Sequence, residues 1–130
     1  MFDPQGHLIR RIASHGPLDA PWGIALAPAS FGDLGGALLI GNLGDGAINA
    51  FEPRSGRFLG QLRGTDNRRG TDNRPLHVDG LWGIQFGNGI LGQPTNALFW
   101  AAGPNDETDG AYGVINVAGG TEQGSDGESY

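Results

Sequence analysis

The sequence contains an internal repeat, and this feature constrains the fold of the chain more than any other. The matched segments are APWGIAL (20–26) with GLWGIQF (80–86), GALLIGN (36–42) with NALFWAA (96–102), GAINAF (46–51) with GVINVA (113–118), and 2–12 with 51–62. Self-similarity of this kind is typical of folds in which one supersecondary unit is repeated and stacked on its neighbour. We therefore expect two equivalent units.

Each matched segment has the pattern of a short β-strand. The segments are apolar or alternating runs bounded by Gly, Pro, Asn or Asp, and 25 of the 130 residues are glycine. Such runs, separated by turn-forming residues, predict strands, and no window shows a helical period. The expected strands are 22–26, 37–41, 47–51 and 57–62 in the first unit, 82–86, 97–101 and 113–117 in the second, and a lone copy of the fourth strand at 7–12.

Four strands per unit predict an all-β fold, a fragment of a β-propeller with two four-stranded blades. Because the lone fourth strand comes first, one blade is divided between the two ends of the chain, in the strand order D-ABCD-ABC. The two-blade unit is expected to span residues 1–118. The remaining segment, 119–130, has no aliphatic residue and is expected to be a disordered polar tail.

A duplicated hexapeptide, RGTDNR, fills residues 63–74. It lies between the fourth strand of the first unit and the first strand of the second, so we expect a long surface loop. Lengthening such a loop costs little stability, about 0.6 kcal/mol for each doubling. A tolerated duplication is one interpretation and an arginine-rich recognition loop is the other. Asp66 and Asp72 lie between the arginines, which weakens the loop as an anion site.

The charge of the chain argues against several classes of partner. The net charge is −6, and no Arg or Lys occurs after Arg74. Binding of nucleic acid requires dense positive charge, so nucleic acid and anionic membrane surfaces are not expected partners. There is no cysteine, no apolar leader at the N-terminus, and no apolar stretch long enough to span a membrane.

The sequence resembles the C-terminal third of a bacterial family of uncharacterised NHL-like β-propellers. The resemblance rests on the segments FDPQGHLIRRIASHGPLDAPWGIAL, VDGLWGIQFGNG and NALFWAAGPNDETDG and covers about residues 2–117. It implies a ring of six blades. Some members of that family are secreted, but the compartment of this chain is left open. It implies no established activity and no catalytic residues.

Polar side chains in two loops form the candidate binding site. The candidates are Asn42, Asp45, Asn105, Asp106 and Asp109, all expected at the same end of the two units. They predict a polar, acidic mouth, and the oxygen atoms of 105–110 suggest weak calcium binding, although solvated turns are the plainer interpretation. His7, His15 and His77 show no metal-binding spacing. Trp22, Trp82 and Trp100 are predicted to pack in the core.

These features favour a non-enzymatic scaffold or binding module that assembles with copies of itself. We expect residues 82–117 of one chain to be joined by the strand at 7–12 of the next, through Leu8, Ile9 and Ile12. A head-to-tail contact of this kind closes into a ring, and six blades would make a homotrimer. The alternative is a metal-dependent hydrolase or lactonase with an acidic central mouth. No cofactor and no particular small-molecule ligand is indicated.

Overall fold

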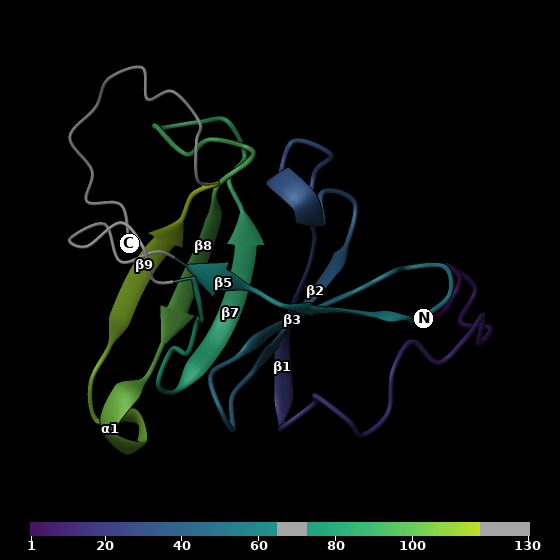
Figure 1. Cartoon of the computed structure of the whole chain (residues 1–130), viewed down its shortest axis with the longest axis horizontal. Helices are drawn as coiled ribbons and strands as arrows, with labels where there is room; N and C mark the ends of the chain where they lie inside the picture. Colours follow the sequence, from purple (N-terminus) through teal and green to yellow (C-terminus); the bar gives the residue numbers. More distant parts are fainter. Residues whose placement is uncertain (65–72, 118–130) are drawn as a thin grey trace.

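A computed structural model describes residues 1–64 and 73–117 of the chain, and these form an all-β structure (Figure 1). The strands are β1 (Pro21–Leu26), β2 (Leu38–Asn42), β3 (Ile48–Phe51), β4 (Phe58–Gln61), β5 (Arg63–Gly64), β6 (Arg74–Pro75), β7 (Leu81–Phe86), β8 (Leu98–Ala102) and β9 (Ala111–Ile115). They make three antiparallel sheets, β1-β2-β3-β4, β5-β6 and β7-β8-β9. The all-β prediction is therefore confirmed. The expected tail at 119–130 lies outside the described residues.

The sequence repeat is also a repeat of strand pairing. Ile24 lies opposite Ile40 in the first sheet, and Ile84 lies opposite Trp100 in the same position of the other sheet. In the third strands, β3 and β9, the residues that occupy equivalent positions differ from those that the match of 46–51 with 113–118 aligns. Leu38 pairs with Phe51 and Leu98 pairs with Ile115, so Ile115 corresponds to Phe51 and not to Ile48.

The core of the molecule lies between the two larger sheets, where β1 packs against β7. Its buried residues come from both sheets and from the connections between them: Ala27, Phe31, Ala37, Leu39, Ile48, Ala50, Leu62, Leu81, Ile84, Leu98 and Ile115. Glycines allow the close approach of the sheets. A Cβ atom at Gly41 would lie 2.9 Å from Cδ2 of Leu81, and one at Gly23 would lie 2.6 Å from the carbonyl oxygen of Trp82. The two sheets therefore form a single packed unit.

Helical structure in the described residues is limited to two short turns. A 3-10 turn, η1, spans Gly32–Leu34, and α1 spans Pro104–Glu107. Asn105, Asp106 and Glu107 all have positive φ, at 55°, 53° and 66°, so the chain turns in the left-handed sense here. Among the residues described, no helix is long and apolar enough to cross a membrane.

The predictions for two tryptophans were wrong. Trp22 is 68% exposed and Trp82 is 43% exposed, and their ring centroids lie 6.5 Å apart. Each follows the first residue of its strand at a point where the pairing register shifts, and such bulges redirect side chains. Trp100 agrees with the prediction, because it is half-buried against the core.

The expected strand at 7–12 joins neither large sheet. Within the described residues its only strand pairing is an isolated bridge between Phe2 and Leu8, and the amide of Ile9 donates to the carbonyl oxygen of Met1. Leu8 and Ile9 are exposed, whereas Ile12 is half-buried. In Figure 1 this segment lies at the opposite side of the molecule from β9. The chain therefore does not complete its own three-stranded sheet with these residues.

The duplicated hexapeptide begins and ends in a small hairpin. Arg63 pairs with Pro75 and Gly64 pairs with Arg74, and the guanidinium of Arg63 donates to the carbonyl oxygen of Asn73 at 2.9 Å and 3.2 Å. Residues 65–72 lie outside the described residues. The two ends of the loop predicted for 63–74 are therefore held together by the pairing of β5 with β6.

We expect deletion of residues 69–74 to change the free energy of unfolding by less than about 1 kcal/mol. The remaining copy supplies the same Arg-Gly and Arg-Pro pairs, so the base of the hairpin can form again. Urea unfolding of the two proteins at equal concentration measures the difference. A loss of several kcal/mol would mean that the second copy makes a contact that stabilises the fold.

The turn between β3 and β4 is closed by Glu52. Its carboxylate accepts hydrogen bonds from the amides of Arg54 and Ser55, and the amide of Gly56 donates to the carbonyl oxygen of Glu52. Hydrogen bonds from the side chain of Ser55, and then from these amides, lower the pKa of Glu52 from 4.5 to about 2. The turn is therefore built around an ionised carboxylate.

Replacement of Glu52 with Gln is expected to change the pH dependence of stability. Because the pKa of Glu52 is lower in the folded chain, its stabilising effect is complete above about pH 4.5 and disappears as the pH falls toward 2. The difference in melting temperature between wild type and Glu52→Gln should therefore be largest at neutral pH and shrink through this range. A difference that stays constant from pH 7 to pH 2 would contradict the assignment.

Candidate binding surfaces

The loops that carry the predicted polar residues are linked along one edge of the molecule. The amide of Val78 donates to the carbonyl oxygen of Gly46 at 2.9 Å, and the amide of Gly103 donates to the carbonyl oxygen of Gly80, also at 2.9 Å. The segment 77–80 thus connects the β2-β3 loop to the loop after β8. This edge is the lower one in Figure 1, where α1 is labelled.

Asn42 and Asp45 form hydrogen bonds that stabilise the first loop. The Nδ2 atom of Asn42 donates to Oδ1 of Asp45 at 3.0 Å, and the same oxygen accepts from the amide of Ala47 at 2.9 Å. Asn42 is fully buried and Asp45 is exposed. Asn42 is therefore a structural residue, and Asp45 is the member of this pair that can meet a ligand.

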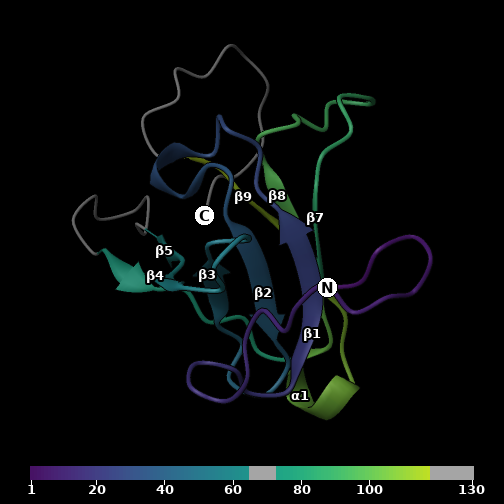
Figure 2. The same cartoon turned by 90° about the vertical axis from the view of Figure 1, so that its right-hand side faces the viewer.

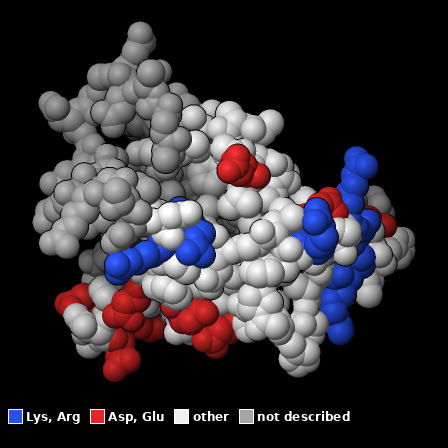
Figure 3. Space-filling view, in the orientation of Figure 1, with Lys and Arg blue, Asp and Glu red and all other residues white. Residues whose placement is uncertain are grey.

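Asn105, Asp106 and Asp109 are all exposed around α1. The backbone amide of Asn105 donates to Oδ2 of Asp79 at 3.1 Å, and its side-chain amide donates to the carboxylate of Asp109. Acidic side chains gather over this edge in Figure 3. Within residues 1–64 and 73–117, no three His, Cys, Asp or Glu side chains lie close enough together to hold a metal ion. The edge is thus an acidic surface without a preformed metal cage in the described residues.

The histidines lie in separate places. His7 lies 2.9 Å from Asp3 through Nδ1, and His77 lies 2.9 Å from the carbonyl oxygen of Asp45 through the same atom. His15 has a φ of 64° in the segment before β1. Hydrogen bonds from the amides of His7, Gln5 and Gly6 and from the His7 ring lower the pKa of Asp3. The His7 contact therefore fixes a local turn, whereas the His77 contact joins the segment after β6 to the β2-β3 loop.

Two buried asparagines hold the segment before β1 against the first sheet, through contacts that were not predicted from the sequence. Asn42 and Asn49 each donate through Nδ2 to the carbonyl oxygen of Pro17, both at 2.9 Å. Neither side chain is exposed, and the Oδ1 atom of each has no hydrogen-bond partner within residues 1–64 and 73–117. In Figure 2 the N-terminal segment lies in front of β1 and β2. The available signal in the sequence was an Asn at the end of one apolar strand pattern and within the next, but the hydrogen-bond partner is distant in sequence.

The first sheet presents an apolar surface on the side away from β7, and we call it the β1 face. It consists of Ile24, Leu26, Leu38 and Ile40, which lie on one side of β1 and β2 because alternate residues of a strand share a side. Ile24 is 62% exposed and Leu26 is 63% exposed, whereas Leu38 and Ile40 are half-buried. The segment before β1 is joined to this side of the sheet at Asn42 and Asn49, through the carbonyl oxygen of Pro17.

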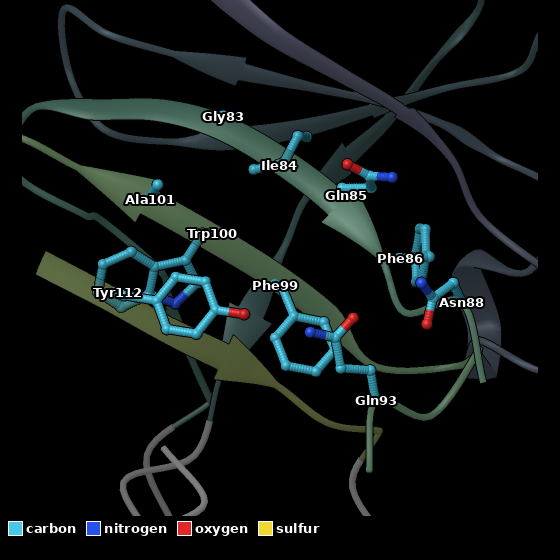
Figure 4. A pocket seen from close by; sticks show the side chains of 10 residues that line it. All are labelled: Gly83, Ile84, Gln85, Phe86, Asn88, Gln93, Phe99, Trp100, Ala101 and Tyr112. Atoms are coloured by element: carbon cyan, nitrogen blue, oxygen red, sulfur yellow. The ribbon is translucent and has the colours of Figure 1, made fainter. Parts of the chain in front are cut away.

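The other sheet presents a groove on its far side, and we call it the β8 groove. The cavity has a volume of about 420 Å³, and Figure 4 shows the side chains around it. Its lining residues are Gly83, Ile84, Gln85, Phe86, Asn88, Gln93, Phe99, Trp100, Ala101 and Tyr112. The rings of Phe99 and Tyr112 are stacked, with centroids 6.0 Å apart. No residue of this lining is charged.

The chain resembles three mimivirus proteins. All three come from Acanthamoeba polyphaga mimivirus and are described as uncharacterized proteins. One is 36% identical over 115 residues, which are 88% of this chain and 26% of that protein. Another is 33% identical over 115 residues, which are 88% of this chain and 28% of that protein. The third is 37% identical over 118 residues, which are 91% of this chain and 20% of that protein. The chain thus spans about a quarter of the first two mimivirus proteins.

These comparisons correct the resemblance that the sequence suggested. The similar proteins are viral and not members of a bacterial NHL-like family. No family model matches the chain, and no solved structure is similar to it. The assignment to that bacterial family was therefore wrong. Short glycine-bounded strands are common to many repeat proteins, so such segments indicate a class of fold more reliably than a lineage.

Proposed function

We propose that this chain is a two-blade unit of a β-propeller that acts as a non-enzymatic scaffold or binding module by joining head to tail with further copies. The observation that carries the proposal is the packing of β1 against β7, the equivalent first strands of the two large sheets. In a propeller the first strands of successive blades lie side by side around the central axis. The two sheets have this relationship within one chain.

The incomplete second sheet supports assembly. The described part of β9 forms one edge of β7-β8-β9, and no described strand pairs with that edge. Residues 7–12 match the fourth strand of the repeat but lie on the other side of the molecule, with Leu8 and Ile9 exposed. Pairing of this segment with β9 of another copy would cover an unpaired sheet edge, which is otherwise prone to aggregation.

The number of copies follows from the number of blades. Propellers close with about four to eight blades, so two, three or four copies of a two-blade chain could form a ring. The expectation of a trimer rested on the six blades of the bacterial family and loses that support with it. The acidic edge carrying Asp45, Asp106 and Asp109 would then be repeated around one end of the ring, where a ligand could meet it.

The test is the mass of the protein in solution, measured by light scattering across a dilution series. We expect a particle of two to four times the chain mass of 13.5 kDa that dissociates on dilution. Replacement of Leu8 and Ile9 together with Asp should reduce the mass, because the exposed segment could no longer pair with β9. A wild-type protein that stays a folded monomer at all concentrations would contradict the proposal.

A further inference from the structure

We infer that the β8 groove of one copy is the docking site for the β1 face of a second copy, in an arrangement that repeats the packing between the two sheets of a single chain. This inference rests on the proposed assembly and specifies the surfaces that would meet. The partner is a second copy because the two open surfaces correspond, position by position, to the two halves of the interface already present in the chain.

Within the chain, the two large sheets form an interface to which β7 and β8 contribute one side. The residues of the β1 face occupy the equivalent positions of the first sheet. Ile24, Leu38 and Ile40 occupy the positions that Ile84, Leu98 and Trp100 occupy in the other sheet. Ile84 and Leu98 are buried against the first sheet, and Trp100 packs against the same core. The β1 face therefore has the residue types of a surface that packs on another sheet, but in the single chain it remains largely exposed.

The β8 groove corresponds to the other half of that interface. Gly83, Gln85, Phe99 and Ala101 occupy the positions that Gly23, Ala25, Leu39 and Gly41 occupy in the first sheet. In the first sheet, Gly23 accommodates Ile84, and a Cβ atom added at Gly23 would lie 3.1 Å from Cγ1 of that residue. At Gly83 an added Cβ atom would have no neighbour within 4 Å among the residues that the structure describes. This space is where the equivalent residue of a second copy, Ile24, would lie.

The chemistry of the two surfaces suits such a contact. The β1 face is entirely apolar, and the β8 groove combines the Phe99 and Tyr112 rings with small residues and amides. Neither surface carries a charge that would have to be desolvated on docking, which favours an interface core. Contact between different surfaces of identical chains is head-to-tail, and it closes into a ring when the rotation between copies allows.

The arrangement also predicts a partner for the exposed tryptophans. Within the chain, Trp22 of β1 lies near Trp82 of β7. If docking repeats this packing, Trp22 of the second copy would lie near Trp82 of the first. Successive copies would then carry a continuous row of tryptophans along their first strands, and assembly should change the tryptophan fluorescence.

Two variants test the inference separately from the assembly itself. Ile24→Arg places a charge on the β1 face, and Gly83→Arg fills the β8 groove at a residue without positive φ. Both sites are open in the single chain, so folding should be unchanged in circular dichroism. Each variant alone should be monomeric at concentrations where the wild type assembles. When mixed, they should form a heterodimer of twice the monomer mass, because one intact β1 face and one intact β8 groove remain.

Ile90→Arg is the matched control, since Ile90 is 60% exposed and belongs to neither surface, and it should assemble as the wild type does.

The outcomes distinguish this inference from the proposed function. If the wild type assembles and both variants still assemble, other surfaces make the contact and only this inference fails. If the two folded variants are monomeric but do not form a heterodimer, the head-to-tail pairing is wrong. A monomeric wild type overturns the proposed function together with this inference. Should either arginine variant fail to fold, Leu26→Arg and Gln85→Arg probe the same two surfaces, and continued assembly of both would overturn the inference.

Discussion

Replacement of Leu81 with alanine is expected to lower the free energy of unfolding by about 2–5 kcal/mol. Leu81 is completely buried between the two large sheets, and its Cδ2 atom packs over Gly41. The backbone on both sides is fixed by strand pairing, so the structure can relax only partly around the space left by the lost side chain. The cavity would lie where the sheets meet and would weaken their packing.

Urea unfolding at a fixed protein concentration measures this loss, since assembly would make stability depend on concentration. Leu91→Ala is the control, because Leu91 is almost fully exposed and removal of its side chain exposes no core. Its stability should match that of the wild type within about 0.5 kcal/mol. A loss below 1 kcal/mol for Leu81→Ala would mean that the two sheets do not depend on this contact.

Replacement of Asn49 with aspartate is expected to cost about 3–5 kcal/mol at neutral pH, the range found when a buried charge loses its partner. The Nδ2 atom of Asn49 donates to the carbonyl oxygen of Pro17, and the side chain is completely buried. A carboxylate in that position would place an oxygen atom against the carbonyl oxygen. Both groups are acceptors, so the hydrogen bond would be replaced by repulsion.

The pH dependence of this variant identifies the cause. Burial raises the pKa of a carboxyl group, and a protonated aspartate can donate to the carbonyl oxygen of Pro17 as the amide does. The loss of stability relative to wild type should therefore become smaller as the pH falls. The matched control is Asn88→Asp, since Asn88 is exposed and its Oδ1 atom accepts from the amide of Ile90 at 2.9 Å, as a carboxylate oxygen also could. A penalty for Asn49→Asp that is equal at pH 3 and pH 7 would count against this explanation.

The sequence was sufficient to predict the seven strands of the two large sheets and their order. Strands such as 22–26 and 82–86 are local patterns, with apolar residues bounded by turn residues, and the repeat showed that they occupy equivalent positions. The same local reasoning predicted that the loops carrying Asp45 and Asp106 would follow equivalent strands. The pairing of Ile24 with Ile40 and of Ile84 with Trp100 bears out this equivalence in the first two strands of each unit.

The features that were not predicted from the sequence depend on contacts between residues that are distant in sequence. The segment 7–12 has the pattern of a strand, but a strand requires a partner edge, and in the described part of the chain its only strand pairing is a bridge to Phe2. The exposure of Trp22 depends on a register shift that no local pattern reveals. The hydrogen bond between Asn42 and Pro17 was also not predicted, because it joins residues that only the fold brings together.

The strand pairing at the two ends of the duplicated hexapeptide has a consequence for the gene. Arg-Gly on one side of the hairpin and Arg-Pro on the other are kept as long as one whole copy remains, because every copy begins with Arg-Gly and ends with Arg, and the last copy is followed by Pro75. Slippage of a polymerase in steps of six codons would therefore change the length of the loop without altering the bonds that anchor it. We therefore expect different numbers of copies to be compatible with the fold, and we expect the same loop to accept an inserted affinity tag or fluorophore-binding peptide.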